Sequence, residues 1–149
     1  MTTQRPTLDQ INVVTARFAE SLDFYRLLGV DLPEARVFKK VGILHHVSAA
    51  VESGAYFDLD SETFAQVWNS GWKGCAELGG RVLVTFRFQS RDGVDACYGA
   101  LMRGGHRTLH PPSDAFWGVR FAAVEDPNGL AVGLMSPAEP SMRTRPPDF

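Results

Sequence analysis

Apolar residues along the chain recur with the period of a strand in some segments and with the period of a helix in others. The order of a strand-like segment followed by a helix-like segment occurs twice. The extended run at residues 10–14 precedes a segment with the i, i+3, i+4, i+7 spacing of one helical face, and the run at 83–88 precedes another. The inward positions of the two predicted helices are Ser21, Phe24, Tyr25 and Leu28 in the first and Val94, Cys97, Tyr98 and Leu101 in the second. These patterns predict two strand–helix pairs.

The second strand–helix pair follows the first at one constant offset in the sequence. The interval from Gln10 to Leu83 equals the interval from Leu28 to Leu101, so strand start and helix face are in register. Self-similarity at a fixed offset is the sequence signature of an internal repeat. We therefore expect two units of similar structure.

Strand-like pieces follow each predicted helix. They cover residues 37–38, 43–51 and 55–59 in the first half and 107–109, 119–124 and 130–135 in the second. Asp126-Pro127-Asn128-Gly129 is typical of a hairpin turn, since proline presets φ and Asn-Gly tolerates positive φ. The sequence therefore predicts an α+β fold of two tandem βαβββ units that form a curved mixed sheet around a cleft.

The predicted globular domain covers residues 10–136. Unit one spans about 10–60 and unit two about 81–136. The linker 61–80 begins with a short helix carrying Phe64, Val67 and Trp68, which Asp60 or Ser61 can cap, and continues through glycine-rich sequence. Residues 1–9 form an N-terminal extension, and the proline-rich residues 137–149 form an extended tail unless they dock on a neighbouring element.

Composition excludes several classes of function. The 149 residues carry 15 Lys and Arg against 17 Asp and Glu without a basic run, so we expect no nucleic-acid partner. No apolar stretch approaches the about 20 residues that span a bilayer, and the polar start containing Pro6 is unlike a secretory signal. The two cysteines, Cys75 and Cys97, lack a C-x-x-C spacing and are expected to be reduced thiols. We therefore expect a cytoplasmic protein without a membrane partner.

Three motifs resemble those of one superfamily. They are Ser21-Leu22-Asp23-Phe24-Tyr25-Arg26 with Leu28-Gly29, then Phe116-Trp117-Gly118, then Asp126-Pro127-Asn128-Gly129. Together they are similar to the vicinal oxygen chelate superfamily, the glyoxalase, bleomycin-resistance and ring-cleaving dioxygenase group, over residues 10–137. The resemblance implies the paired βαβββ fold, a small-molecule ligand and a homodimer. It says little about the reaction, because this fold hosts many activities and several pure binders.

The resemblance also implies four metal-ligand positions, one on the first and one on the last strand of each unit. They fall on Gln10, on Asp58 or Asp60, on Leu83 and on Gly133. Leucine and glycine have no side-chain donor, and two remaining oxygen ligands would leave most of an octahedral shell to water. We expect no metal and no other cofactor.

The candidate catalytic residues are Asp58, His46 and Tyr56. Neighbouring residues on a strand point to opposite faces, so at most one of His45 and His46 faces the cleft. His46 near Asp58 would make a general base. Alternatively, both histidines lie on a surface hairpin. Asp58 lines the cleft, or it belongs to a strand-end turn with Asp60 as a helix cap.

Strand alternation suggests which side chains meet a ligand. The candidates are Gln10 and Asn12 on the first strand, Asp58, then Leu83, Thr85 and Arg87 on the second-half strand, and Trp117 with Arg120. Phe86 and Phe88 would pack on the second helix instead. Trp117 beside Arg120 forms an aromatic rim that suits a planar ligand, or it packs the hairpin onto the sheet. His106 and His110 are expected in an exposed loop.

These observations predict a metal-independent small-molecule-binding protein that sequesters a planar drug or metabolite. The alternatives are a metal-free enzyme that uses Asp58, His46 or Tyr56, a metal-dependent lyase or isomerase of the glyoxalase kind, and an interaction module without a ligand. A perturbed carboxylate or histidine in the cleft would favour an enzyme.

Overall fold

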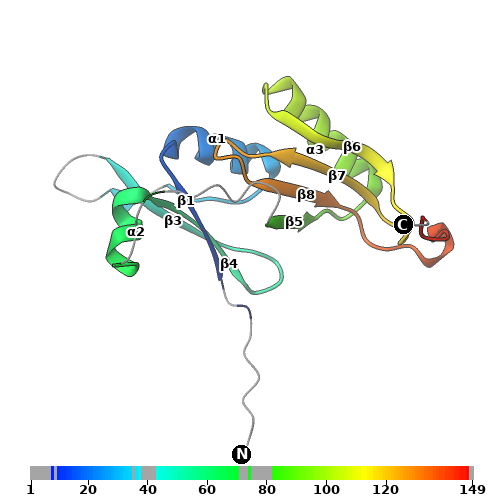
Figure 1. Ribbon diagram of the computed structural model, residues 1–149, viewed down its shortest axis with the longest axis horizontal. Coiled ribbons are helices and arrows are strands. Elements are labelled where there is room, and N and C mark those ends of the chain that lie inside the picture. Colours follow the sequence, from blue (N-terminus) through cyan, green and yellow to red (C-terminus); the bar gives the residue numbers. More distant parts are fainter. Residues whose placement is uncertain are drawn as a thin grey trace, which may run out of the picture. The chain divides into compact units, whose positions relative to one another are not determined.

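The computed structural model describes residues 8, 10–34, 36–37, 43–70, 74 and 82–147. The chain divides into two compact units, residues 1–75 and 76–149. Unit one consists of β1 (Gln10–Thr15), α1 (Phe18–Leu28), β2 (Arg36–Val37), β3 (Leu44–Ala50), β4 (Tyr56–Ser61) and α2 (Glu62–Trp68). Its sheet has the order β1-β4-β3-β2, with β1 parallel to β4 and the other pairs antiparallel (Figure 1).

Unit two repeats this plan. It consists of β5 (Leu83–Arg87), α3 (Arg91–Arg103), β6 (Arg107–Asp114), β7 (Arg120–Glu125), β8 (Ala131–Met135) and the 3-10 turn η1 (Pro140–Met142). The sheet order β5-β8-β7-β6 again pairs the first strand with the last in parallel. The prediction of an α+β fold with two βαβββ units is confirmed, and β5 follows β1 at the same interval at which α3 follows α1.

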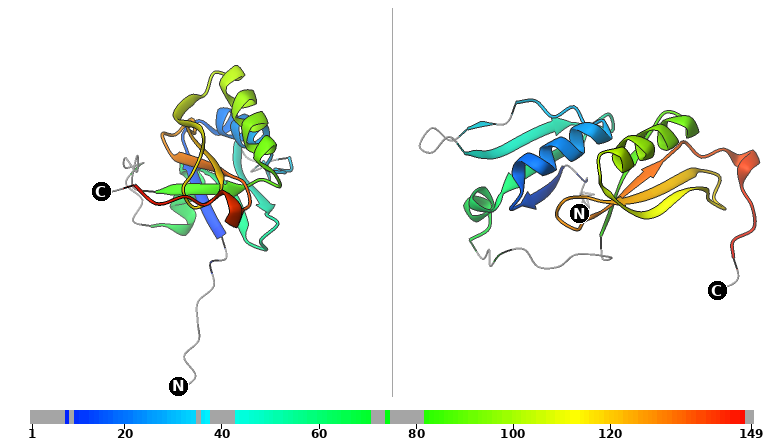
Figure 2. Two further views of the ribbon diagram at one scale, coloured as in Figure 1. Left: turned by 90° about the vertical axis from the view of Figure 1, so that its right-hand side faces the viewer. Right: turned by 90° about the horizontal axis from the view of Figure 1, so that it is seen from above.

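In each unit one helix covers one face of the sheet. Phe24 and Tyr25 of α1 are fully buried, and the Tyr25 ring lies 4.5 Å from that of Phe57 on β4. In unit two, Val94 and Leu101 of α3 are fully buried, and Figure 2 shows α3 running along its sheet. The helical faces that the sequence predicts therefore form the two cores, leaving the opposite sheet faces for other side chains.

One strand boundary differs from the expectation, and Ser61 is confirmed as one of the two predicted caps of α2. The strand expected at 107–109 extends to Asp114 and includes Pro111 and Pro112, so His110 lies in a strand and not in a loop. Prolines are tolerated there because β6 is an edge strand with register shifts. The cap of α2 is Ser61, whose Oγ accepts from the Phe64 amide at 3.1 Å, whereas Asp60 belongs to β4. Phe38 and most of the glycine-rich linker lie outside the described residues.

Residues that follow β8 dock on unit two. The Glu139 amide donates to the Gly118 carbonyl, and the Thr144 amide donates to the Phe116 carbonyl, both at 2.9 Å. A Cβ built on Gly118, whose φ is +94°, would lie 2.5 Å from the Glu139 carbonyl oxygen, so only glycine permits this approach. The segment is therefore held by the 115–119 turn and is not a free tail.

No helix within the described residues is both long and apolar enough to cross a membrane.

Candidate functional site

A row of polar side chains lies on the face of unit one opposite α1. Along β4, Phe57 and Leu59 point toward α1, so strand alternation directs Asp58 and Asp60 to the other face. Both carboxylates are buried nonetheless: Asp58 is 6% exposed and Asp60 is fully buried. A buried carboxylate is costly unless hydrogen bonds compensate it.

The amide of Asn12 on β1 joins the two carboxylates. Its Nδ2 donates to Asp60 Oδ2 at 2.8 Å and, more weakly, to Asp58 Oδ2 at 3.4 Å. Its Oδ1 accepts from Gln10 Nε2 at 2.9 Å, which fixes the orientation of the amide. The structure therefore brings Gln10, Asn12 and Asp58 together, as the strand alternation predicts.

His46 on β3 pairs with Asp60. Its Nδ1 lies 2.6 Å from Asp60 Oδ1, and its ring stacks on Phe64 of α2 at 4.9 Å. The expectation that His46 lies beside Asp58 is wrong, because the register places His46 opposite Asp60 and Ser48 opposite Asp58. His46 therefore pairs with the carboxylate of Asp60 and not with that of Asp58.

His45 points to the other side of the sheet. It is buried, and its Nδ1 lies 2.9 Å from the Ser61 hydroxyl that caps α2. The alternative that both histidines lie on a surface hairpin or its edge is wrong, because His45 is buried and β3 has a neighbouring strand on each side.

Asp58 keeps one oxygen without a partner. Its Oδ1 is the one buried side-chain oxygen or nitrogen in the described part of the chain that makes no hydrogen bond. The turn-and-cap explanation of Asp58 is wrong, since Asp58 lies in the middle of β4. Tyr56 precedes it on the same face but is exposed at the end of the strand, where it lies opposite Gln10.

Unit two carries a glycine where unit one carries this acid. Thr85 lies opposite Gly133 in the β5–β8 register, as Asn12 lies opposite Asp58 in the β1–β4 register. A Cβ at Gly133 would lie 2.6 Å from Thr85 Oγ1 and 3.2 Å from its methyl group. Thr85 thus fills the space that a side chain at position 133 would need.

The same face of unit two carries aromatic rings. The Trp117 ring lies 5.0 Å from Phe116 and 5.9 Å from Phe121, and His110 lies 6.0 Å from Phe121. Trp117 is 41% exposed, so it both packs on the hairpin and presents a ring surface to solvent. Leu83, Thr85 and Arg87 are also exposed, as expected for one face of β5.

Arg120 lies apart from this aromatic row. Its Nε donates to Asp95 of α3 at 2.9 Å and its Nη1 to Asp114 at 3.1 Å, so it lies on the helix-covered side of β7. The hydrogen bond to Asp95 raises the pKa of the Arg120 guanidinium. The expectation of Arg120 beside Trp117 on a ligand rim therefore fails, because Arg120 and Phe121 point to opposite faces.

The Cys97 thiol is a poor nucleophile. Burial raises its pKa to about 11, so it stays protonated at neutral pH. Cys75 lies outside the described residues.

Comparison with known proteins places the chain in a family. The sequence profile of the glyoxalase/bleomycin resistance protein/dioxygenase superfamily matches residues 7–134. The chain belongs to this superfamily. None of the curated proteins compared with it matches significantly.

Solved structures share the glyoxalase fold at low identity. A glyoxalase/bleomycin resistance protein/dioxygenase from Nocardioides is 23% identical with a TM-score of 0.68, over 99% of this chain and 92% of that one. A glyoxalase-related enzyme from Fulvimarina pelagi is 17% identical with a TM-score of 0.69, over 88% of each chain. Lactoylglutathione lyase from Agrobacterium tumefaciens is 14% identical with a TM-score of 0.62, over 89% and 94%. At these identities the likeness shows the fold alone.

The metal-ligand positions of the glyoxalase superfamily do not fit a metal in this chain. Gln10 and Asp58 offer oxygen donors, but Leu83 offers none, and Thr85 occupies the space beside Gly133. The described residues also contain no group of three or more His, Cys, Asp or Glu side chains arranged to hold a metal ion. The donor set is therefore incomplete in unit two.

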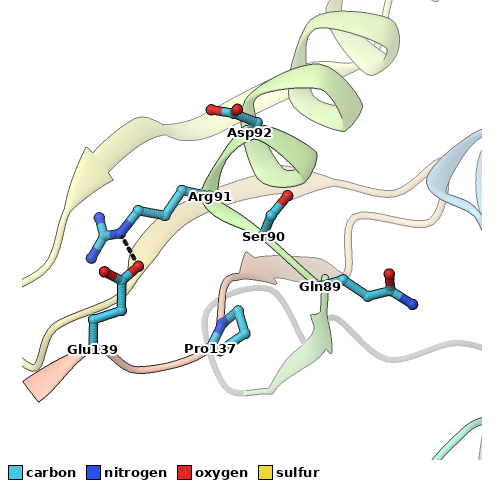
Figure 3. A pocket seen from close by; sticks show the side chains of 6 residues that line it. All are labelled: Gln89, Ser90, Arg91, Asp92, Pro137 and Glu139. Carbon is cyan, nitrogen blue, oxygen red and sulfur yellow. Dashed lines mark hydrogen bonds and ion pairs between the residues drawn. The ribbon is translucent and has the colours of Figure 1, made fainter.

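Two pockets lie beside charged side chains. One of about 200 Å³ in unit one is lined by Pro33, Glu34, His46, Val47 and Ser48. One of about 380 Å³ in unit two lies between the start of α3 and the docked segment (Figure 3), and is lined by Gln89, Ser90, Arg91, Asp92, Pro137 and Glu139. In the second pocket Arg91 Nε donates to Glu139 Oε1 at 2.7 Å. The guanidinium of Arg91 is therefore already paired with a carboxylate.

Proposed function

We propose that this chain is a metal-independent small-molecule-binding protein of the glyoxalase/bleomycin-resistance type that sequesters a planar drug or metabolite. The observation that carries the proposal is the unpaired Oδ1 of Asp58, which is 6% exposed. Leaving a buried acceptor unsatisfied costs about 1–3 kcal/mol, and more when it is charged. A hydrogen-bond donor on a ligand would remove this cost.

The surroundings of Asp58 favour a ligand with a cationic donor. Among the described residues no Lys or Arg pairs with Asp58, and its other oxygen receives a long bond from Asn12 at 3.4 Å. The fully buried Asp60 adds a second carboxylate on the same face. A protonated amine or amidine on a planar ring would supply both the donor and the compensating charge.

Asp58→Asn is expected to weaken binding of proflavine, a planar dye with exocyclic amino groups, by about 10- to 100-fold, since a hydrogen bond to a charged group contributes about 1.5–3 kcal/mol. Dye fluorescence titrated with the protein measures the dissociation constant. Asp23→Asn, which changes an exposed acid on α1, is the matched control and should leave the affinity unchanged.

Two results would contradict the proposal. One is equal affinity for proflavine in the original protein and in Asp58→Asn. The other is one tightly held metal per chain in the purified, untagged protein by mass spectrometry, which would instead favour a lyase or isomerase of the glyoxalase kind.

Trp117→Ala is expected to weaken stacking of proflavine on unit two about 2- to 10-fold, a contact separate from that of Asp58 in unit one, with little change in melting temperature. Stacking on an aromatic ring contributes about 0.5–1.5 kcal/mol beyond area burial, and the exposed face of Trp117 is available for it. Leu109→Ala, an exposed apolar truncation on β6, is the control. A collapsed thermal transition in the Trp117 variant would show a core role for this ring instead.

A further inference from the structure

We propose that residues 137–144, which follow β8, form a strap that holds the ring of Trp117 in position, and that Arg91 fastens this strap. Trp117 lies in the turn between β6 and β7, and the strap docks on both sides of it. The value of this device for binding rests on the proposed stacking of a planar ligand on Trp117. It adds Arg91 and the strap as the elements that position the stacking ring.

The strap binds the peptide groups on either side of Trp117. The Thr144 amide donates to the Phe116 carbonyl, and the Glu139 amide donates to the Gly118 carbonyl, both at 2.9 Å. A connecting turn is usually among the more mobile parts of a domain, because few contacts restrain it. One hydrogen bond before the tryptophan and one after it therefore restrict the directions in which its side chain can point.

Arg91 joins the strap to the turn and to the end of β6. Its Nε donates to Glu139 Oε1 at 2.7 Å, its Nη2 to the Gly118 carbonyl oxygen at 2.9 Å and its Nη1 to Asp114 Oδ1 at 2.9 Å. Figure 3 shows the side chain reaching from the start of α3 to the carboxylate of Glu139. A planar guanidinium with several partners fixes their geometry as well as binding them. Arg91 therefore couples the position of the strap to that of the turn.

Gly118 allows the strap to approach the turn closely. Its φ is +94°, and a Cβ built on it would lie 2.5 Å from the Glu139 carbonyl oxygen and 2.9 Å from Arg143 Cγ. An alanine at this position must therefore push the strap away. Gly129, in the hairpin between β7 and β8, has a similar φ of +84°, but nothing in the described part of the chain lies within 4 Å of its built Cβ. It has the same backbone constraint without the strap.

A ring that is held in place binds a planar ligand more tightly than a mobile ring. Trp117 is 41% exposed and packs edge-on against Phe116, so the turn determines which part of the indole meets solvent. If the strap is detached, the ring has to be ordered when the ligand binds, and this entropy cost lowers the affinity. Arg91 and the strap are thus positioning elements that act through Trp117.

Fluorine-19 NMR of the full chain labelled with 5-fluorotryptophan tests the position of the ring without any ligand. The sequence contains three tryptophans, and Trp117→Phe identifies the signal of Trp117. We expect Arg91→Ala and Gly118→Ala each to shift this signal by more than its linewidth or to broaden it. Arg107→Ala, which removes the same charge from an exposed position on β6, and Gly129→Ala are the matched controls and should leave the signal unchanged.

Proflavine titration of variants made in the Asp58→Asn chain measures binding to unit two, since that substitution weakens the proposed contact in unit one. We expect Arg91→Ala in this chain to weaken binding about 2- to 10-fold, as far as Trp117→Ala does. The two substitutions together should weaken it no further than Trp117→Ala alone, because they remove one contact. Additive losses would contradict the proposal, since the strap would then act without Trp117.

Two NMR results would also overturn the proposal. One is an unchanged Trp117 signal in folded Arg91→Ala, which keeps the test decisive if Gly118→Ala does not fold. The other is an equal change of the signal in Gly118→Ala and Gly129→Ala, which would show backbone strain alone. Failure of the proposed stacking is a separate outcome: it appears as an unchanged proflavine affinity in Trp117→Ala, whereas the NMR signal tests the strap without ligand.

Discussion

Asp60→Ala is expected to lower the free energy of unfolding by about 2–4 kcal/mol, because it leaves two hydrogen-bonding groups without their shared acceptor. Asp60 is fully buried and meets His46 Nδ1 at 2.6 Å and Asn12 Nδ2 at 2.8 Å. Its removal leaves a half-buried imidazole and an amide without their shared acceptor. Urea denaturation followed by circular dichroism measures the change.

Asp58→Asn is the matched control for that measurement. It alters an acid on the same face of β4, two residues earlier, whose Oδ1 makes no hydrogen bond. We expect its stability to stay within about 1 kcal/mol of the original or to rise, since the Oδ1 atom that the substitution leaves or replaces has no hydrogen bond to lose. A loss for Asp58→Asn as large as that for Asp60→Ala would show that both acids serve the fold alone.

Asp58 and Asp60 both lie on β4, but their hydrogen bonds differ. Asp60 is saturated by neighbours from β1 and β3, as a structural group should be. Asp58 faces the same side with one long hydrogen bond and one unpaired oxygen, and a buried polar atom without a partner requires an explanation such as a ligand contact. The ligand contact proposed above therefore falls on Asp58, whereas the hydrogen bonds of Asp60 are taken up by His46 and Asn12.

The repeat made the fold predictable from the sequence. The constant offset that relates Gln10 to Leu83 and Leu28 to Leu101 places two strand–helix pairs in register, and strand alternation then places Asn12 on one face with the acids of β4. The partner of His46 was not predictable, because a two-residue change in the β3–β4 register would exchange one acid for the other. That register depends on the turn at 51–55, which composition does not define to the residue.

The position of Arg120 shows another limit of strand alternation. Phe121, Ala122, Ala123 and Val124 are all apolar, so the sequence of β7 does not reveal which alternate residues face α3. Asp95 and Asp114, the two acids that bind Arg120, lie 25 and 6 residues away in sequence. Ion pairs of this kind depend on tertiary packing, and no local motif marks them.

Gly133→Ala is expected to destabilise unit two by about 1–3 kcal/mol, the usual cost of overpacking a filled site. The added Cβ would lie 2.6 Å from Thr85 Oγ1 and 3.3 Å from Phe121 Cε2, and a threonine on a strand has no long side chain that can swing aside. Thermal unfolding measures the change. Thr85→Ala in the same chain should recover most of the loss, since it removes the two closest atoms.

Gly99→Ala provides the matched control in the same unit. This glycine lies inside α3, where an added Cβ meets only the flexible end of Arg103 at 3.3 Å. Alanine is favoured over glycine in a helix by about 1 kcal/mol, so stability should hold or rise. Equal losses at both glycines would contradict the packing explanation. The expected difference also explains why position 133 cannot supply a metal ligand here: any side chain added there must first displace Thr85.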